Sequence, residues 1–173
     1  QVIRDFKFAA ENDCTGIFVD RPWEHWATQG PQYYLMGKLT WNPDQDGQAL
    51  LKDYYRRGFG PASEHIEAYW SLMERTRQTF INSDKSYPEI YDSTFFDRAY
   101  ELLRKASDAV ADAPAKYSNR IGFVRTGLDF TKLMIEIRDL MAKYRASDRT
   151  DAQAAAKVRA KWKEIRHICQ RHP

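Results

Sequence analysis

The stretch LTWNPDQDGQALLKDYYRRGFGPA, residues 39–62, decides the fold of this chain because it places a short helical pattern between two helix breaks. Pro43 disfavours helical geometry at Asn42, so a helix that runs through Leu39 must end there. Asp46 is a good N-cap for a new helix. That helix has an apolar face made of Leu50, Leu51, Tyr54 and Tyr55. The Gly-Phe-Gly-Pro sequence from Gly58 ends it and starts the next.

Amphipathic patterns continue on both sides of this stretch. Upstream, apolar residues at helical spacing predict helices over residues 2–11 and 30–41. Downstream, the same spacing predicts helices over residues 61–80, 93–110, 117–144 and 155–169, with a loop over residues 86–91. Because the connections are short, successive helices are expected to run antiparallel and to form a bundle.

The longest predicted helix, residues 117–144, has two apolar stripes. The first stripe contains Ile121, Val124, Leu128, Thr131 and Ile135, and the second contains Phe123, Gly127, Phe130, Met134, Ile137 and Met141. A helix that is apolar on two faces lies between neighbours and not at the rim of a bundle. Gly122 and Gly127 lower helix propensity and would allow a neighbouring helix to approach closely.

One segment predicts a strand. Residues 15–19, TGIFV, are short, apolar and β-branched. A helix followed by a lone strand is half of an α/β unit, and a single strand is not stable alone. The predicted fold class is therefore mainly α, a bundle of about five to six helices preceded by a short α/β remnant with one strand.

The composition is that of a globular chain. Of its 173 residues, 43% are hydrophobic and 14% aromatic, which is enough to bury a core. The net charge is +3, but residues 115–173 hold 14 Lys and Arg against six Asp and Glu. A basic last third is usually the solvated face of amphipathic helices, and it is also compatible with a polyanion partner.

Motifs for nucleotides, metals and nucleophilic catalysis are absent from the sequence. No glycine-rich phosphate loop or nucleophile-elbow pattern occurs. The four histidines do not form a metal-ligand pattern, and Cys14 and Cys169 are read as two unrelated thiols. We therefore expect no catalytic residues within the chain, no metal site and no cofactor. No apolar run is long enough to span a membrane.

One loop carries a cluster suited to sugar chemistry. It directly follows the predicted strand and contains Asp20, Arg21, Trp23, Glu24, His25 and Trp26. Carboxylates can bind sugar hydroxyls or transfer protons, and tryptophan faces stack on a pyranose ring. Asp20, Arg21, Trp23, Glu24 and Trp26 are the candidate substrate-binding residues. The alternative is a loop whose tryptophans pack against the helical domain.

Several of these segments together resemble a known family. They are Gly16-Ile17-Phe18, the run from Tyr34 to Asp44, Tyr54-Tyr55, the run from Gly58 to Ala62, and the helix that contains Arg120 to Leu128. This pattern resembles the C-terminal region of large bacterial glycoside-hydrolase-like proteins, many of them uncharacterised. In those proteins a (β/α)8 barrel is followed by a helical domain.

The resemblance implies a domain plan and a role. Residues 1–42 would be the end of a barrel-like domain and residues 43–173 a C-terminal helical domain. A whole barrel needs about 250 residues, so this chain alone is not expected to hydrolyse sugars. It would be a structural fragment that gives at most a rim loop to a sugar site. Its partners would be the rest of the parent chain and a carbohydrate, without nucleic acid.

The start of the sequence supports the same expectation. The chain lacks an initiator Met and a signal peptide and opens on a helical pattern, so we expect a piece of a longer protein. For that parent protein a secreted or periplasmic location is expected. The alternative function is a stand-alone helical interaction module whose basic surface binds a polyanion or a protein partner.

Overall fold

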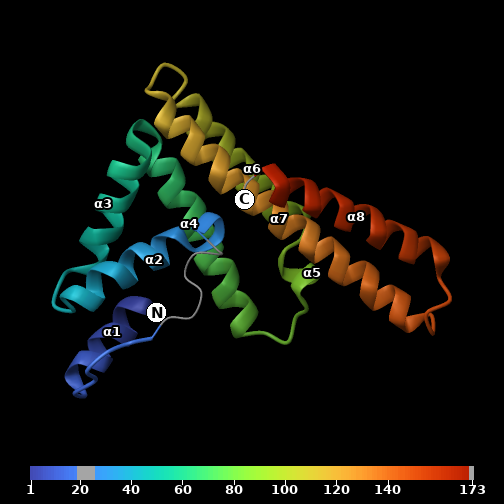
Figure 1. The fold of residues 1–173 in the computed structure, drawn as a ribbon, viewed down its shortest axis with the longest axis horizontal. Helices are drawn as coiled ribbons and strands as arrows, with labels where there is room; N and C mark the ends of the chain where they lie inside the picture. Colours follow the sequence, from blue (N-terminus) through green and yellow to red (C-terminus); the bar gives the residue numbers. More distant parts are fainter. Residues whose placement is uncertain (19–25, 172–173) are drawn as a thin grey trace.

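The computed structural model describes residues 1–18 and 26–171, and these residues are mainly helical (Figure 1). Their elements are α1 (Val2–Glu11), α2 (Trp26–Trp41), α3 (Gly47–Phe59), the 3₁₀ turn η1 (Gly60–Ala62), α4 (Ser63–Ile81), α5 (Tyr87–Ile90), α6 (Ser93–Asp108), α7 (Ala115–Ala146) and α8 (Ala152–Arg171). The mainly α class is therefore confirmed.

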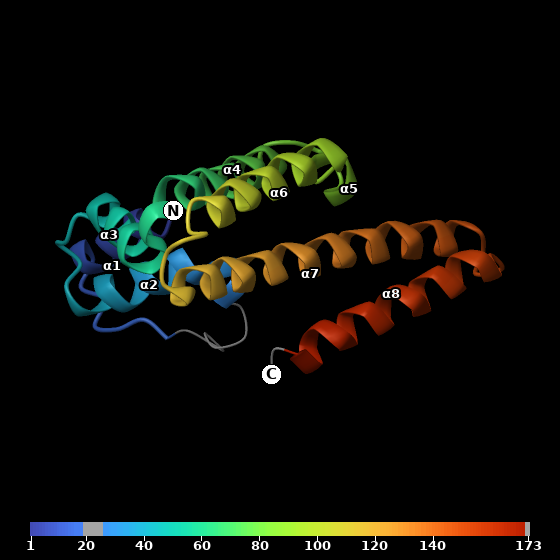
Figure 2. The ribbon, with the colours of Figure 1, turned by 90° about the horizontal axis from the view of Figure 1, so that it is seen from above.

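The helices form a bundle with two differently built ends. Helices α1, α2 and α3 gather at one end, and the hairpin of α7 and α8 extends to the other (Figure 1). Seen from above, α7 runs between the pair α4 and α6 on one side and α8 on the other (Figure 2). This position agrees with the two apolar stripes predicted for α7.

Side-chain caps fix where the helices begin and end. The Asp46 carboxylate accepts hydrogen bonds from the backbone N–H groups of Gln48 and Ala49 at the start of α3. Asp92 caps α6 in the same way through Phe95 N–H. At the end of α2, the side-chain amide of Gln45 donates to the carbonyls of Lys38 and Asn42. The predicted break at Asn42-Pro43 is confirmed.

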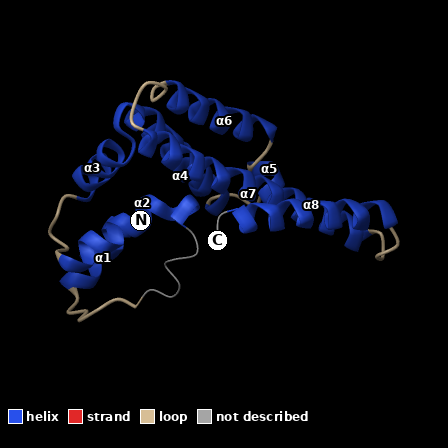
Figure 3. Cartoon of the chain, turned by 45° about the horizontal axis from the view of Figure 1, so that its top comes forward, coloured by secondary structure: helices blue, strands red, loops and turns tan. Residues whose placement is uncertain are grey.

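The predicted strand is wrong over its described part. Residues 15–18 have no strand geometry, and Figure 3 shows no strand among residues 1–18 and 26–171. Ile17 is partly exposed, and Phe18 has 90% of its surface exposed. A β-strand needs a neighbouring strand to pair its backbone, and the described residues offer none. Val19, the last residue of the predicted strand, lies outside the described residues.

Two local predictions also need correction. The predicted loop at 86–91 contains the single-turn helix α5, because Ser86 and Glu89 form a capping box at its start. Helix α2 begins at Trp26 and not at Gly30. It has a kink at Gln29, whose backbone is non-helical, and Pro31 follows just after that kink.

Three apolar clusters hold the fold together. The main core lies among α3, α4, α6 and the first part of α7, where Ile66, Leu103 and Leu128 are fully buried. A second cluster joins α7 to α8 through Leu133, Ile137, Val158 and Ile165. A third joins α1 to α2 through Phe6, Leu35 and Leu39. Burial of such side chains contributes about 1.5–3 kcal/mol each.

Candidate functional site

A pocket of about 360 Å³ lies where α2, α3 and α7 meet. Its volume is within the range of small-molecule sites, about 300–1,000 Å³. The lining is aromatic with two guanidinium groups, from Trp26, Tyr34, Tyr54, Arg57, Gly58, Phe59, Arg120, Phe123 and Val124.

Trp26 stands at the start of α2 and at the edge of the described chain. Its ring packs edge-on against Tyr33, with 5.1 Å between the ring centres, and 46% of its surface is exposed. An indole held on one side and open on the other can accept a flat apolar ligand face. Trp26 is the described member of the predicted sugar-binding loop.

Two tyrosines, one from α2 and one from α3, form an aromatic wall of the pocket. The Tyr34 and Tyr54 rings lie 5.3 Å apart, and Tyr54 packs edge-on against Phe59 at 5.8 Å. A Cβ at Gly30 would lie 2.5 Å from the Tyr54 hydroxyl oxygen, so a glycine is needed for this approach. Burial raises the pKa of Tyr54 to about 12, so its hydroxyl is protonated at neutral pH.

Asp53 organises the polar side of the pocket. Its Oδ1 accepts hydrogen bonds from Arg57 Nε at 2.7 Å and Arg56 Nη2 at 3.0 Å. Its Oδ2 accepts the Tyr34 hydroxyl at 3.2 Å. These donors, Arg57 first, lower the pKa of Asp53 to about 2. The network fixes Tyr34 and Arg57 at the pocket wall.

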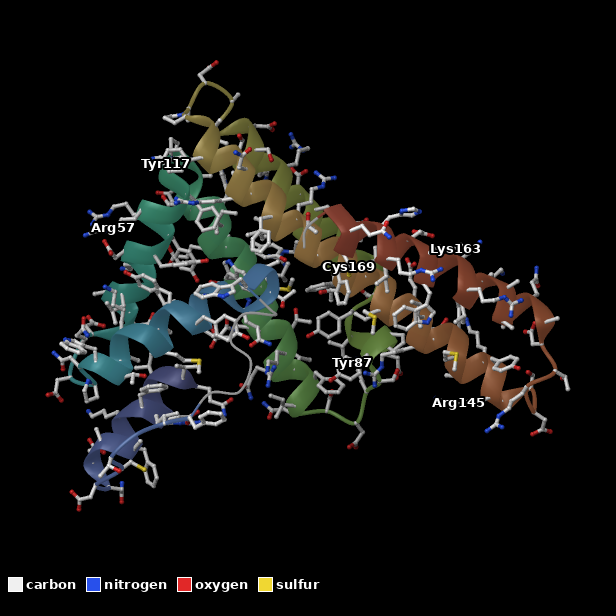
Figure 4. The ribbon with its side chains drawn as sticks, in the orientation of Figure 1. Arg57, Tyr87, Tyr117, Arg145, Lys163 and Cys169 are labelled. Atoms are coloured by element: carbon white, nitrogen blue, oxygen red, sulfur yellow. The ribbon has the colours of Figure 1, made fainter. Side chains whose placement is uncertain are left out.

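Arg120 connects α7 to the end of α3. Its Nη1 donates to the carbonyl oxygens of Gly58 at 2.8 Å and Arg57 at 3.3 Å. Carbonyls in the last turn of a helix lack helical partners and carry partial negative charge, so a guanidinium group is favourable there. Figure 4 shows Arg57 on α3 and Tyr117 near the start of α7, close to that helix end.

A close contact between α2 and α7 lies next to the pocket residues Trp26 and Phe123 in the sequence. A Cβ at Gly127 of α7 would lie 2.6 Å from the carbonyl oxygen of Ala27 on α2. The predicted close approach at Gly127 is thus confirmed, whereas at Gly122 no atom lies within 4 Å. The contact sets the start of α2, and with it Trp26, beside Phe123 and Val124.

The predicted site is only partly placed. Asp20, Arg21, Trp23 and Glu24 lie outside the described residues, so their roles stay predictions. Trp26 lines the pocket. The sequence pattern placed Tyr54 on a helix face and Tyr34 in the run that carries the family resemblance, and it assigned no function to Arg57 or Arg120. The sequence feature that could have indicated these pocket residues is the Tyr-Tyr-Arg-Arg run at residues 54–57, next to the Gly-x-Gly-Pro break.

No cluster of His, Cys, Asp or Glu within residues 1–18 and 26–171 has the arrangement of a metal site. Cys14 and Cys169 are both exposed free thiols, and Figure 4 shows Cys169 on α8. In the same part of the chain, none of the helices combines the length and the apolarity that a membrane span requires.

The basic last third is spread over the α7–α8 hairpin. Figure 4 places Arg145 near the end of α7 and Lys163 on α8. Several cations there have intramolecular partners. Lys161 pairs with Glu136 at 2.7 Å, Lys143 pairs with Asp139 at 2.7 Å, and Arg138 lies over the Tyr87 ring at 4.4 Å. A polyanion partner stays a prediction.

The N-terminal part of the chain matches a known family. Residues 1–71 match a domain of unknown function, DUF4838. The match covers α1 to the middle of α4, and so includes the segment 20–26 and the pocket residues on α2 and α3. Its description states no activity, so it leaves the glycoside-hydrolase resemblance as a hypothesis. No curated protein and no solved structure matches the chain.

Proposed function

We propose that this chain is the C-terminal structural part of a carbohydrate-active protein of the glycoside-hydrolase type. In this proposal the chain is not catalytic alone. It contributes the rim segment 20–26 and the adjoining aromatic pocket to a sugar site. The observation that carries the proposal is Trp26, half exposed at the mouth of a pocket with Tyr34 and Tyr54.

The pocket chemistry supports a sugar as ligand. A pyranose has an apolar face of C–H groups and an edge of hydroxyls. Aromatic rings suit the face, and the protonated hydroxyl of Tyr54 and the guanidinium groups suit the edge. A few fixed polar groups among aromatic side chains is the usual composition of a small-molecule site.

Exposed apolar residues support a neighbouring domain. Phe8 on α1 and Phe18 after it are largely exposed, and Ile17 is partly exposed. These residues precede the segment 20–26. Large apolar side chains that are exposed favour burial against another surface. The rest of a barrel-like domain is the partner that the sequence resemblance implies.

The test is oligosaccharide binding by the 173-residue chain on an array of neutral and acidic glycans. We expect at least one oligosaccharide to be retained and none to be cleaved. Trp26→Ala should lower the affinity about tenfold, which is about 1.4 kcal/mol. Trp41→Ala is the matched control, because Trp41 is 90% exposed and does not line the pocket. No retention, or equal losses in both variants, would refute the proposal.

A further inference from the structure

The pocket has a charge that a neutral sugar does not require. Its described lining contains the guanidinium groups of Arg57 and Arg120 and no carboxylate. Asp53 lies behind the wall and already accepts three hydrogen bonds, from Tyr34, Arg56 and Arg57. Two guanidinium groups therefore contact this carboxylate, and Arg120 adds a third positive charge at the end of α3. Three arginines against one carboxylate leave this side of the pocket with a net positive charge.

Both arginines keep donors for a ligand. Arg57 uses Nε for Asp53, and Arg120 uses Nη1 for the carbonyls at the end of α3. Within residues 1–18 and 26–171, the Nη groups of Arg57 and Nη2 of Arg120 donate no hydrogen bond to another residue. A guanidinium group has five donors in a planar fork that matches a carboxylate.

The existing bonds also hold these groups in place. Arg57 is fixed through Asp53, and Arg120 is fixed across two helices. Donors that are already oriented lose less conformational freedom on binding, which favours affinity. An exposed arginine without such partners would have to be ordered by the ligand.

From this geometry we infer that the pocket binds a sugar that carries a carboxylate, a hexuronic acid residue, with the carboxylate at Arg57 and Arg120 and the ring against the aromatic wall. This inference rests on the proposed function and narrows its ligand class. The aromatic rings supply contact area, and the arginines distinguish the acid from the corresponding neutral sugar.

The experiment compares matched sugars by NMR titration of the 173-residue chain. The probes are methyl glucuronoside against methyl glucoside, methyl galacturonoside against methyl galactoside, and acetate as the carboxylate without a ring. We expect one uronoside to bind at least about tenfold more tightly than its neutral partner, the size of a charge-assisted hydrogen bond. Acetate should bind more weakly than that uronoside.

Two neighbouring arginines provide a variant and its control. Arg57→Gln should reduce the preference for the acid about tenfold, whereas Arg56→Gln should leave it nearly unchanged. Both side chains are about equally exposed, at 76% and 75%, and both bind Asp53, but only Arg57 lines the pocket. Circular dichroism verifies that each variant is folded.

The outcomes separate this inference from the proposed function. Equal binding of acidic and neutral sugars would overturn the inference and leave the sugar pocket standing. Acetate binding as tightly as the uronoside would also overturn it, because the ring would then contribute nothing. If no sugar in the set or on the array binds, both proposals fail.

Discussion

Gly127 and Ala27 are in backbone contact, and this contact places α2 on α7. A Cβ at Gly127 would lie 2.6 Å from the Ala27 carbonyl oxygen and 2.9 Å from the Ala27 Cβ. A backbone atom cannot move aside as the end of a flexible side chain can. The position of Trp26, one residue before Ala27, therefore depends on the absence of a side chain at residue 127.

Gly127→Ala should destabilise the protein despite the better helix propensity of alanine. The propensity gain is at most about 1 kcal/mol, and overpacking at such a contact costs about 1–3 kcal/mol. Gly122→Ala, in the same helix with no atom within 4 Å, should stabilise the fold by up to about 1 kcal/mol. Urea unfolding of both variants measures the difference. If both substitutions changed the free energy of unfolding by the same amount in the same direction, the close contact at Gly127 would be contradicted.

Gly60→Ala should destabilise the corner between α3 and α4. Gly60 has a φ of 53°, and a Cβ there would lie 2.7 Å from the Tyr117 ring. Left-handed backbone costs a non-glycine residue about 1 kcal/mol or more, and the ring must also move. Gly58→Ala, with nothing within 4 Å, is the control. Thermal unfolding should show a lower midpoint for Gly60→Ala alone.

Asp53 should contribute to acid unfolding. Its pKa falls from the ordinary 3.8 to about 2 in the folded protein, because Arg57, Arg56 and Tyr34 donate to the carboxylate. A lowered folded-state pKa stabilises the protein above pH 4, and this stabilisation is lost as the pH falls from about 4 to about 2. Asp53→Asn should make the stability curve flatter in that window.

The control for this pH experiment is Asp44→Asn. Asp44 is exposed and has no ion pair to a described residue. Its replacement removes no contact with the network around Asp53, so a change that both variants share is not caused by that network. If Asp53→Asn and the unmodified protein lose stability in parallel over that interval, the network around Asp53 does not hold in solution.

The second cluster should open separately from the main core. Ile165→Ala removes a buried side chain between α7 and α8, and Leu103→Ala removes one from the main core. Each substitution should lower the free energy of unfolding by about 2–5 kcal/mol. Hydrogen exchange should show Ile165→Ala loosening α8 and the second half of α7, with α4 and α6 still protected. Leu103→Ala should lower the exchange protection of all the helices. If both variants lost protection equally in all helices, the chain would unfold as one cooperative unit, contrary to this prediction.

Local signals made most of the helices predictable from sequence. Asp46, Asp92 and the Asn42-Pro43 pair act within a few residues of themselves, so they mark helix ends before any packing is known. The two stripes of α7 likewise predicted neighbours on two faces. Residues 15–18 were wrongly predicted as a strand because a strand needs a second strand to pair with. The spacing of apolar residues within one segment does not show whether such a strand exists.

The pocket depended on information that is not local. Tyr34, Tyr54 and Arg120 come from three helices and meet because Gly127 admits α2 and because Arg120 reaches the end of α3. Each residue alone reads as part of an amphipathic helix. Of the predicted rim residues, Trp26 gains a structural setting, while Asp20, Arg21, Trp23 and Glu24 keep the status of predictions.

The most direct test is an NMR titration of the unmodified chain with an oligosaccharide that the array has identified as a ligand. The signals followed are those of the tryptophan indole N–H groups. Trp26 reports the pocket, and the exposed Trp41 and Trp162 are internal references. If the chain contributes an aromatic pocket to a sugar site, the Trp26 signal shifts with saturation while the two reference signals stay in place. A Trp26 signal that does not move, or that moves together with both references, would contradict the account.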